Sequence, residues 1–150
     1  MGDRVSRGVD AQLDSMRVLK SSVQSIKPTV LVVEDDEFQR TTLKQLLKGA
    51  DQEIVLAPGA REAFAILRER RPDVVLLDIE LPDIDGRQIL ASLKTKGNPL
   101  VDVPVIMITG HGEKEVVTEC IRAGAVDFVV KPFSKEITLT KLRKALQSST

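Results

Sequence analysis

The sequence predicts an α/β fold in which helices cover both faces of a parallel sheet. Five short apolar segments alternate with amphipathic stretches of helical spacing along most of the chain. The apolar segments are rich in Leu or β-branched residues and show little polar alternation, which is typical of strands buried on both faces. Regular alternation of strand and helix favours parallel strands joined by helical crossovers.

Size and composition indicate one compact domain. The chain has 150 residues, of which 42% are hydrophobic and 29% charged. Its 22 basic residues balance 22 acidic residues, so no overall field would attract nucleic acid or an anionic membrane. No apolar run approaches the roughly 18 residues of a membrane span, and the N-terminus lacks the apolar stretch of a signal peptide. We therefore expect a cytoplasmic protein that binds neither nucleic acid nor a membrane.

Each element can be placed by its pattern. We expect strands over residues 29–33, 53–57, 73–78, 103–109 and 126–130, and helices over residues 38–48, 61–70, 88–96, 114–123 and 135–147. Gly97-Asn98-Pro99 is expected to end the third helix, and Gly124 to close the fourth in a left-handed conformation. The single Cys120 lies on the apolar side of the fourth helix and is expected to be a core residue.

Residues 1–27 differ from the rest, because they are polar and lack strand character. Apolar residues recur there at heptad spacing with one polar break: Val9, Met16 and Val23, then Leu19 and Ile26, with Gln12 interrupting. The segment is either a dimerising or linking helix or a frayed, disordered tail, and the pattern does not choose between them. A homodimer through this helix is one interpretation. The folded domain is expected to occupy residues 28–150.

Four of the five expected strands end in polar or charged groups. These groups are Glu34-Asp35-Asp36, Asp78, Thr109-Gly110-His111 and Lys131-Pro132-Phe133, in strand order. Open parallel sheets bind ligands beyond the carboxyl ends of their strands. Structural roles are the alternative for single residues: Asp36 would cap the following helix, and Asp83 and Asp85 would serve the turn before Gly86.

Three carboxylates at one edge of the sheet would repel one another unless a cation lay between them. Oxygen ligands from Asp35, Asp78 and a backbone carbonyl suit Mg²⁺, which is usually held by one or two carboxylates together with water or phosphate. With Glu34 as the third carboxylate, Mg²⁺ and Lys131 would make the site neutral. A phosphoryl group on Asp78 would add negative charge, for which Lys131 and the Thr109 hydroxyl are the available donors.

Taken together, these motifs resemble the receiver domain of two-component response regulators, of the single-domain type that includes chemotaxis regulators. The acidic pair Glu34-Asp35 and the runs LLDIELPDIDG, MITG and FVVKPF occur in the family's order and spacing over roughly residues 28–148. The resemblance implies a flavodoxin-like, doubly wound sheet with strand order 2-1-3-4-5 and five helices. It also implies that residues 28–150 are the receiver domain.

For the site, the resemblance implies that Asp78 accepts a phosphoryl group from a histidine kinase or a phosphotransfer protein. Mg²⁺ or Mn²⁺ would be bound by Asp35 and Asp78 directly, by Glu34 through water and by the backbone carbonyl of Glu80. Thr109 and Lys131 would bind the phosphoryl oxygens.

Further positions carry regulatory roles by the same resemblance. Thr109 and Phe128 would form the switch, and Phe128 lacks the hydroxyl of the Tyr often found there. Glu80 and His111 would tune the hydrolysis of the phosphorylated state, and a solvated loop residue is the alternative interpretation of His111. The bond between Lys131 and Pro132 would be cis.

The resemblance implies a signalling domain rather than a turnover enzyme. Phosphorylation would change the face formed by the fourth helix, the fifth strand and the fifth helix, and so alter binding of a downstream protein. No output domain follows Gln147, so output by protein contact is expected unless the chain is a fragment. The enzymatic alternative is a Mg²⁺-dependent aspartyl phosphatase. Such an enzyme would have a second Asp where this chain has Glu80. A binding module without phosphorylation is disfavoured because the functional positions are filled.

Overall fold

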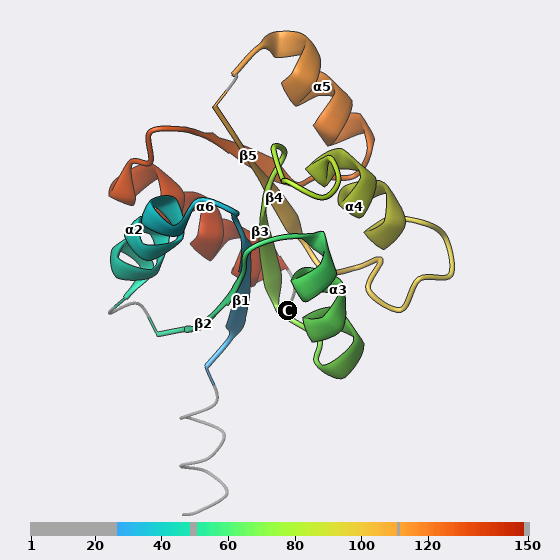
Figure 1. Cartoon of the computed structure of the whole chain (residues 1–150), viewed down its shortest axis with the longest axis horizontal. Coiled ribbons are helices and arrows are strands. Elements are labelled where there is room, and N and C mark those ends of the chain that lie inside the picture. Colours follow the sequence, from blue (N-terminus) through green and yellow to red (C-terminus); the bar gives the residue numbers. More distant parts are fainter. Residues whose placement is uncertain (1–26, 49–50, 111, 149–150) are drawn as a thin grey trace, which may run out of the picture.

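The computed structural model describes residues 27–48, 51–110 and 112–148. Within these ranges five parallel strands form one sheet in the order β2-β1-β3-β4-β5 (Figure 1). The strands are β1 (Thr29–Val33), β2 (Glu53–Ala57), β3 (Val74–Asp78), β4 (Val105–Thr109) and β5 (Asp127–Val130). The helices are α2 (Glu37–Leu47), α3 (Ala60–Glu69), α4 (Gly86–Leu93), α5 (Lys114–Arg122) and α6 (Lys135–Ser148). The expected flavodoxin-like sheet with five helices is confirmed. The heptad seam and the alternatives for residues 1–26 lie outside the described residues.

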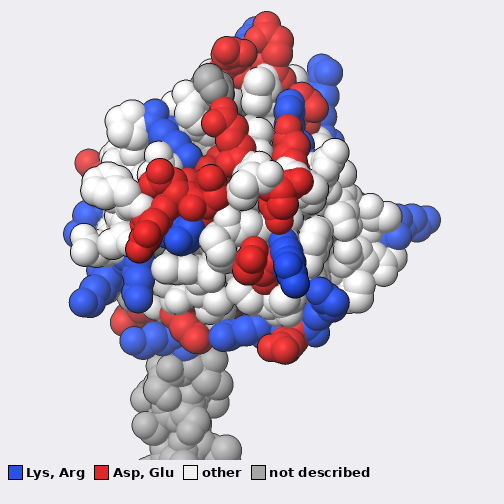
Figure 2. Space-filling view, viewed as in Figure 1, with Lys and Arg blue, Asp and Glu red and all other residues white. Residues whose placement is uncertain are grey.

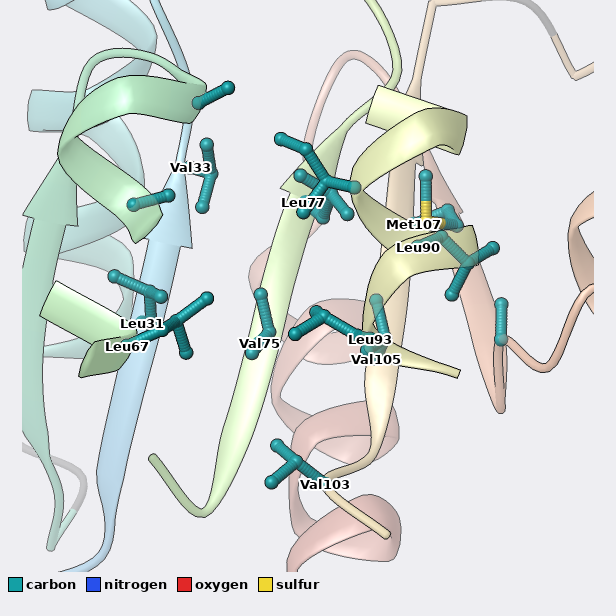
Figure 3. Packing of buried hydrophobic residues seen from close by; sticks show 14 of the residues in the cluster. Leu31, Val33, Leu67, Val75, Leu77, Leu90, Leu93, Val103, Val105 and Met107 are labelled. Carbon is teal, nitrogen blue, oxygen red and sulfur yellow. The ribbon is translucent and has the colours of Figure 1, made fainter. Parts of the chain in front are cut away.

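Two apolar clusters, one on each face of the sheet, form the core. Successive residues of β1 point to opposite faces, as the period of a strand requires. Leu31 belongs to the cluster that α3, α4 and α5 cover, whereas Val32 belongs to the cluster that α2 and α6 cover (Figure 3 shows the first cluster). Cys120 of α5 is buried in the first cluster, as the sequence predicts. Both faces of the sheet are thus covered by helices, and neither helical layer covers the edge at which the loops after the strands lie.

The central strands are buried as expected, but the edge strands are not. Every residue of β1, β3 and β4 is buried. In contrast, β2 and β5 each contain partly buried and exposed residues. The expectation that all five strands are buried on both faces is therefore wrong for these two. They are the edges of the sheet, where each strand has one neighbour and helices cover it less completely.

Most element bounds differ from the expected ones by at most one residue, but two elements differ by more. The fourth strand begins at Val105 instead of 103, directly after Pro104, which has no amide hydrogen to donate to a neighbouring strand. The third helix spans Gly86–Leu93 instead of 88–96. It begins early because Asp85 accepts a hydrogen bond from the Arg87 amide (2.8 Å). It ends early because the chain turns after Leu93, where the Ser92 carbonyl accepts from the Thr95 amide and from the Asn98 side chain, at 3.3 and 2.9 Å. The Lys94 ammonium, beyond the helix, donates to the Val101 and Val103 carbonyls, at 2.9 and 2.6 Å.

Candidate functional site

Charged side chains from the ends of three strands meet at the carboxyl edge of the sheet. Glu34 follows β1, Asp78 is the last residue of β3, and Lys131 follows β5. The parallel register aligns these ends, since Asp78 pairs with Ile108 in β4. Figure 2 shows acidic side chains gathered in the central and upper part of this view, toward the carboxyl ends of the strands. These residues lie together at one edge of the sheet, as the sequence predicts.

The carboxylates of Glu34, Asp35 and Asp78 each place an oxygen within 4.8 Å of the others. Glu34 and Asp78 are only 0% and 1% exposed, whereas Asp35 is exposed. The ammonium nitrogen of Lys131 lies 2.8 Å from Oδ2 of Asp78 and 3.0 Å from Oε2 of Glu34. Two buried carboxylates therefore share one lysine, and the exposed third carboxylate lies on the solvent side.

Backbone groups hold this arrangement in place. The Glu80 amide donates to Oδ1 of Asp78 (2.9 Å), so both oxygens of Asp78 have a donor. The Arg40 guanidinium donates to the carbonyls of Glu34 and Asp35, at 2.9 and 2.7 Å, and fixes the loop after β1. Asp36 accepts from the Gln39 amide and caps α2, which is the structural alternative considered for it.

Burial dominates the electrostatics of the site. It raises the pKa of Glu34 to about 8, and the hydrogen bond and negative charge of Asp78 add to the effect. Lys131 offsets only part of this rise. For Lys131, burial lowers the pKa, but Asp78 and Glu34 outweigh it and the net pKa is raised. Lys131 is therefore cationic at neutral pH, while burial favours the protonated form of Glu34.

The donor set fits a hard divalent cation. Three carboxylates face one ammonium, which leaves net negative charge when all are ionised. Oxygen Oε2 of Glu34 is buried, and despite the nearby lysine it receives no well-directed hydrogen bond from the described residues. Oxygen ligands with this excess of negative charge are the kind that Mg²⁺ and Mn²⁺ prefer.

The other predicted site residues lie around this cluster. Thr109 is buried at the end of β4, and its carbonyl accepts from the Lys131 amide (2.8 Å). Phe128 lies half-buried on β5 and packs against the cluster covered by α3, α4 and α5. Glu80 is exposed in the loop after β3. The bond between Lys131 and Pro132 is cis, as expected. His111 lies outside the described residues.

Sequence reasoning missed the role of Asp83, which it treated as a residue of the turn before Gly86. Its two oxygens accept hydrogen bonds from the amides of Ala60 and Arg61, at 3.1 and 3.0 Å, so it caps α3. These backbone donors lower the pKa of Asp83. The signal was partly visible, because α3 begins after Gly59, which has no side chain to cap the helix. The partner that supplies the missing acceptor lies 23 positions away and could not be read from the chain.

Known proteins of similar sequence support this fold. Residues 30–144 match the family of the response regulator receiver domain. Chemotaxis protein CheY of Listeria monocytogenes is 39% identical over 117 residues, which are 77% of this chain and 96% of that protein. The C4-dicarboxylate transport transcriptional regulatory protein DctD of Pseudomonas aeruginosa is 36% identical over 118 residues, 79% of this chain but 25% of that protein.

Solved structures of lower sequence identity share the fold. A putative response regulator from Chloroflexus aurantiacus superposes with a TM-score of 0.76 at 28% identity, covering 81% of this chain and 99% of that one. Chemotaxis protein CheY4 of Vibrio cholerae gives a TM-score of 0.74 at 28% identity, covering 81% of this chain and 100% of that one. Among the described residues, no helix is both long and apolar enough to cross a bilayer. The chain belongs to the family of response regulator receiver domains, the signalling domains of two-component systems.

Proposed function

We propose that this chain accepts a phosphoryl group on Asp78 from the phosphohistidine of a histidine kinase or a phosphotransfer protein. One observation carries the proposal: the buried Asp78 carboxylate lies 2.8 Å from the Lys131 ammonium and beside two further carboxylates. A structural ion pair needs one acid for one base. Two extra carboxylates beside a buried pair raise its energy, and binding of a cation and a phosphoryl group accounts for them.

The proposed transfer forms a bond between a carboxylate oxygen of Asp78 and phosphorus, while the bond from phosphorus to the imidazole nitrogen of the donor breaks. Lys131 remains protonated and binds a phosphoryl oxygen, and the Thr109 hydroxyl is the second donor. Asp35, Asp78 and the Glu80 carbonyl would hold Mg²⁺ or Mn²⁺, with Glu34 acting through water. When bound, the metal ion would neutralise the charge of the carboxylates and of the phosphoryl oxygens.

We further propose that phosphorylation shifts a two-state equilibrium through Thr109 and Phe128. The face that changes would be formed by α5, β5 and α6, and its output would be contact with another protein. Exposed apolar side chains on α5 and β5 support this, since Ile121 is 44% and Val130 39% exposed. Glu80 and His111 are the positions proposed to tune loss of the phosphoryl group to water.

In this proposal the chain is a signalling domain that assists its own phosphorylation and dephosphorylation rather than a turnover enzyme. The phosphatase alternative is disfavoured, because the second residue after Asp78 is Glu80 where that class of enzyme has Asp. Four further points stay predictions. They are the domain boundary near residue 28, the absence of binding to nucleic acid or membrane, dimerisation through the N-terminal segment, and the cytoplasmic location.

Acetyl phosphate with Mg²⁺ tests the assignment of the acceptor. We expect the full chain to gain one phosphoryl group, seen by intact-mass spectrometry, and Asp78→Asn to gain none because an amide oxygen is a poor nucleophile. Asp102→Asn, an exposed acid in the turn before β4, is the control that should still be labelled. Labelling of Asp78→Asn at an acid-stable site would contradict the proposal, and turnover of a phosphomonoester would favour the phosphatase.

A further inference from the structure

The side chain of Lys141 reaches from α6 to Phe128 on the edge strand β5. Its ammonium nitrogen lies 4.4 Å from the centroid of the Phe128 ring and donates a hydrogen bond to the Phe128 carbonyl. The same nitrogen forms an ion pair with Asp127 at 3.1 Å. The Lys141 side chain is 25% exposed, so these contacts are partly shielded from water. One lysine thus contacts both the ring and the backbone of the residue at the proposed switch position.

Asp127 completes this contact. Its Oδ1 accepts from the Phe128 amide (2.8 Å) as well as from Lys141. Both backbone polar groups of Phe128 are therefore bonded to side chains, which is how an edge strand avoids unpaired groups. The ring itself packs against the cluster on the side of α3, α4 and α5, whereas α6 packs on the opposite face. Lys141 must pass around the edge of the sheet to reach it.

We propose that Lys141 is a positioning residue that holds the Phe128 ring in this half-buried place and thereby sets the equilibrium that phosphorylation has to shift. The inference rests on the proposed switch function. Phenylalanine has no hydroxyl through which a hydrogen bond could hold it. A cation over the ring face can stabilise the ring position in place of such a hydrogen bond, because the quadrupole of the ring attracts the cation.

The cation–π contact between Lys141 and Phe128 depends on the position of the ring, whereas the other contacts of Lys141 do not. If the ring leaves its place, the ammonium stays bonded to Asp127 and to the Phe128 carbonyl, so only the cation–π contact is lost. Contacts of this kind shift an equilibrium by about two- to fivefold when partly exposed. Lys141 should therefore favour the present ring position by about that factor. A purely structural tie between α6 and β5 would instead be indifferent to the charge on residue 141 as long as the hydrogen bonds remained.

Fluorine NMR on the full chain, labelled with 4-fluorophenylalanine, separates these two roles. The chain has four Phe residues, and Phe128→Leu identifies the resonance of interest. Lys141→Gln keeps a hydrogen-bond donor but removes the charge, Lys141→Arg keeps the charge, and Arg143→Met removes an exposed charge from the same helix. We expect the Phe128 resonance to shift and broaden in Lys141→Gln only. With Mg²⁺, we expect Lys141→Gln to convert at a concentration of beryllofluoride, a phosphoryl mimic, about two- to fivefold lower than wild type.

An unchanged Phe128 resonance in Lys141→Gln would overturn the inference, as would an equal response of Arg143→Met. Unchanged resonances of the other three Phe residues show that each variant is folded. A failure of the switch function itself looks different: neither wild type nor variant would respond to beryllofluoride, while the shift of the Phe128 resonance without the mimic would remain.

Discussion

Gly86 packs directly on the backbone of Asp78. A Cβ atom at position 86 would lie 2.0 Å from the Asp78 carbonyl oxygen and 2.9 Å from the Cα of Ile79. The Gly86 amide donates to the Ile79 carbonyl at 2.7 Å. The first residue of α4 therefore supports the main chain at the proposed phosphoacceptor, and only glycine fits there.

Gly86→Ala should destabilise the fold strongly, because backbone has to move to admit the methyl group. We expect the free energy of unfolding, measured with urea, to fall by about 3 kcal/mol or more. Gly110→Ala is the matched control, since nothing lies within 4 Å of its added Cβ. A Gly86→Ala protein as stable as Gly110→Ala would contradict the close contact.

Asp83→Ala should destabilise α3 by removing the acceptor for two of its first amides. The expected loss in the free energy of unfolding is about 1 kcal/mol, with about 2 kcal/mol as the upper range for a helix cap. Hydrogen exchange should accelerate at Ala60 and Arg61, on α3, although the substitution is in the loop after β3. Asp51→Ala, in an exposed turn, is the control, and faster exchange confined to residues next to position 83 would refute the capping role.

Glu34→Gln should make the metal-free protein more stable than wild type as the pH rises. In the folded state Glu34 has a pKa of about 8, compared with its ordinary value of 4.5. The folded protein therefore keeps a proton that the unfolded chain has lost. Its contribution to stability is complete below pH 4.5 and is lost as the pH rises to about 8.

Urea unfolding in the presence of EDTA at several pH values measures this difference. We expect it to grow between pH 5 and pH 8 by an amount on the order of a few kcal/mol, since one pKa unit corresponds to about 1.4 kcal/mol. Glu37→Gln, exposed at the start of α2, should show no such trend. A constant difference between wild type and Glu34→Gln across this range would exclude the raised pKa.

Asp35→Ala should weaken Mg²⁺ binding without loss of the fold, because Asp35 is exposed and its side chain supports no buried contact in the described residues. Mg²⁺ at one hundred times its Kd should stabilise wild type by about 2.7 kcal/mol. The rise in Tm on adding Mg²⁺ should largely disappear in Asp35→Ala and persist in Glu37→Gln. The same rise in both variants would remove Asp35 from the metal site.

The bounds of the elements show what local sequence patterns can predict and what they cannot. The bounds of β1 and β2 agree with the expected ones, because a run of β-branched and Leu residues is a local signal. The early end of α4 was missed because residues 94–96 fit a helical pattern, whereas in the structure the chain turns there and the Asn98 side chain bonds the Ser92 carbonyl. Helix propensity does not reveal that competing contact.

The alternation of strand and helix, and the polar residues at the strand ends, followed from the sequence alone, since periodicity and composition act over a few residues. The site residues could be named for the same reason, with the help of the family's motif spacing. Only the tertiary structure decided which distant groups meet. Lys131 joins Asp78 from 53 positions away, Asp83 caps α3, and Lys141 passes around β5 to the Phe128 ring. These contacts depend on strand register and on how helices pack at an edge, and those are properties of the whole sheet that no local stretch of sequence encodes.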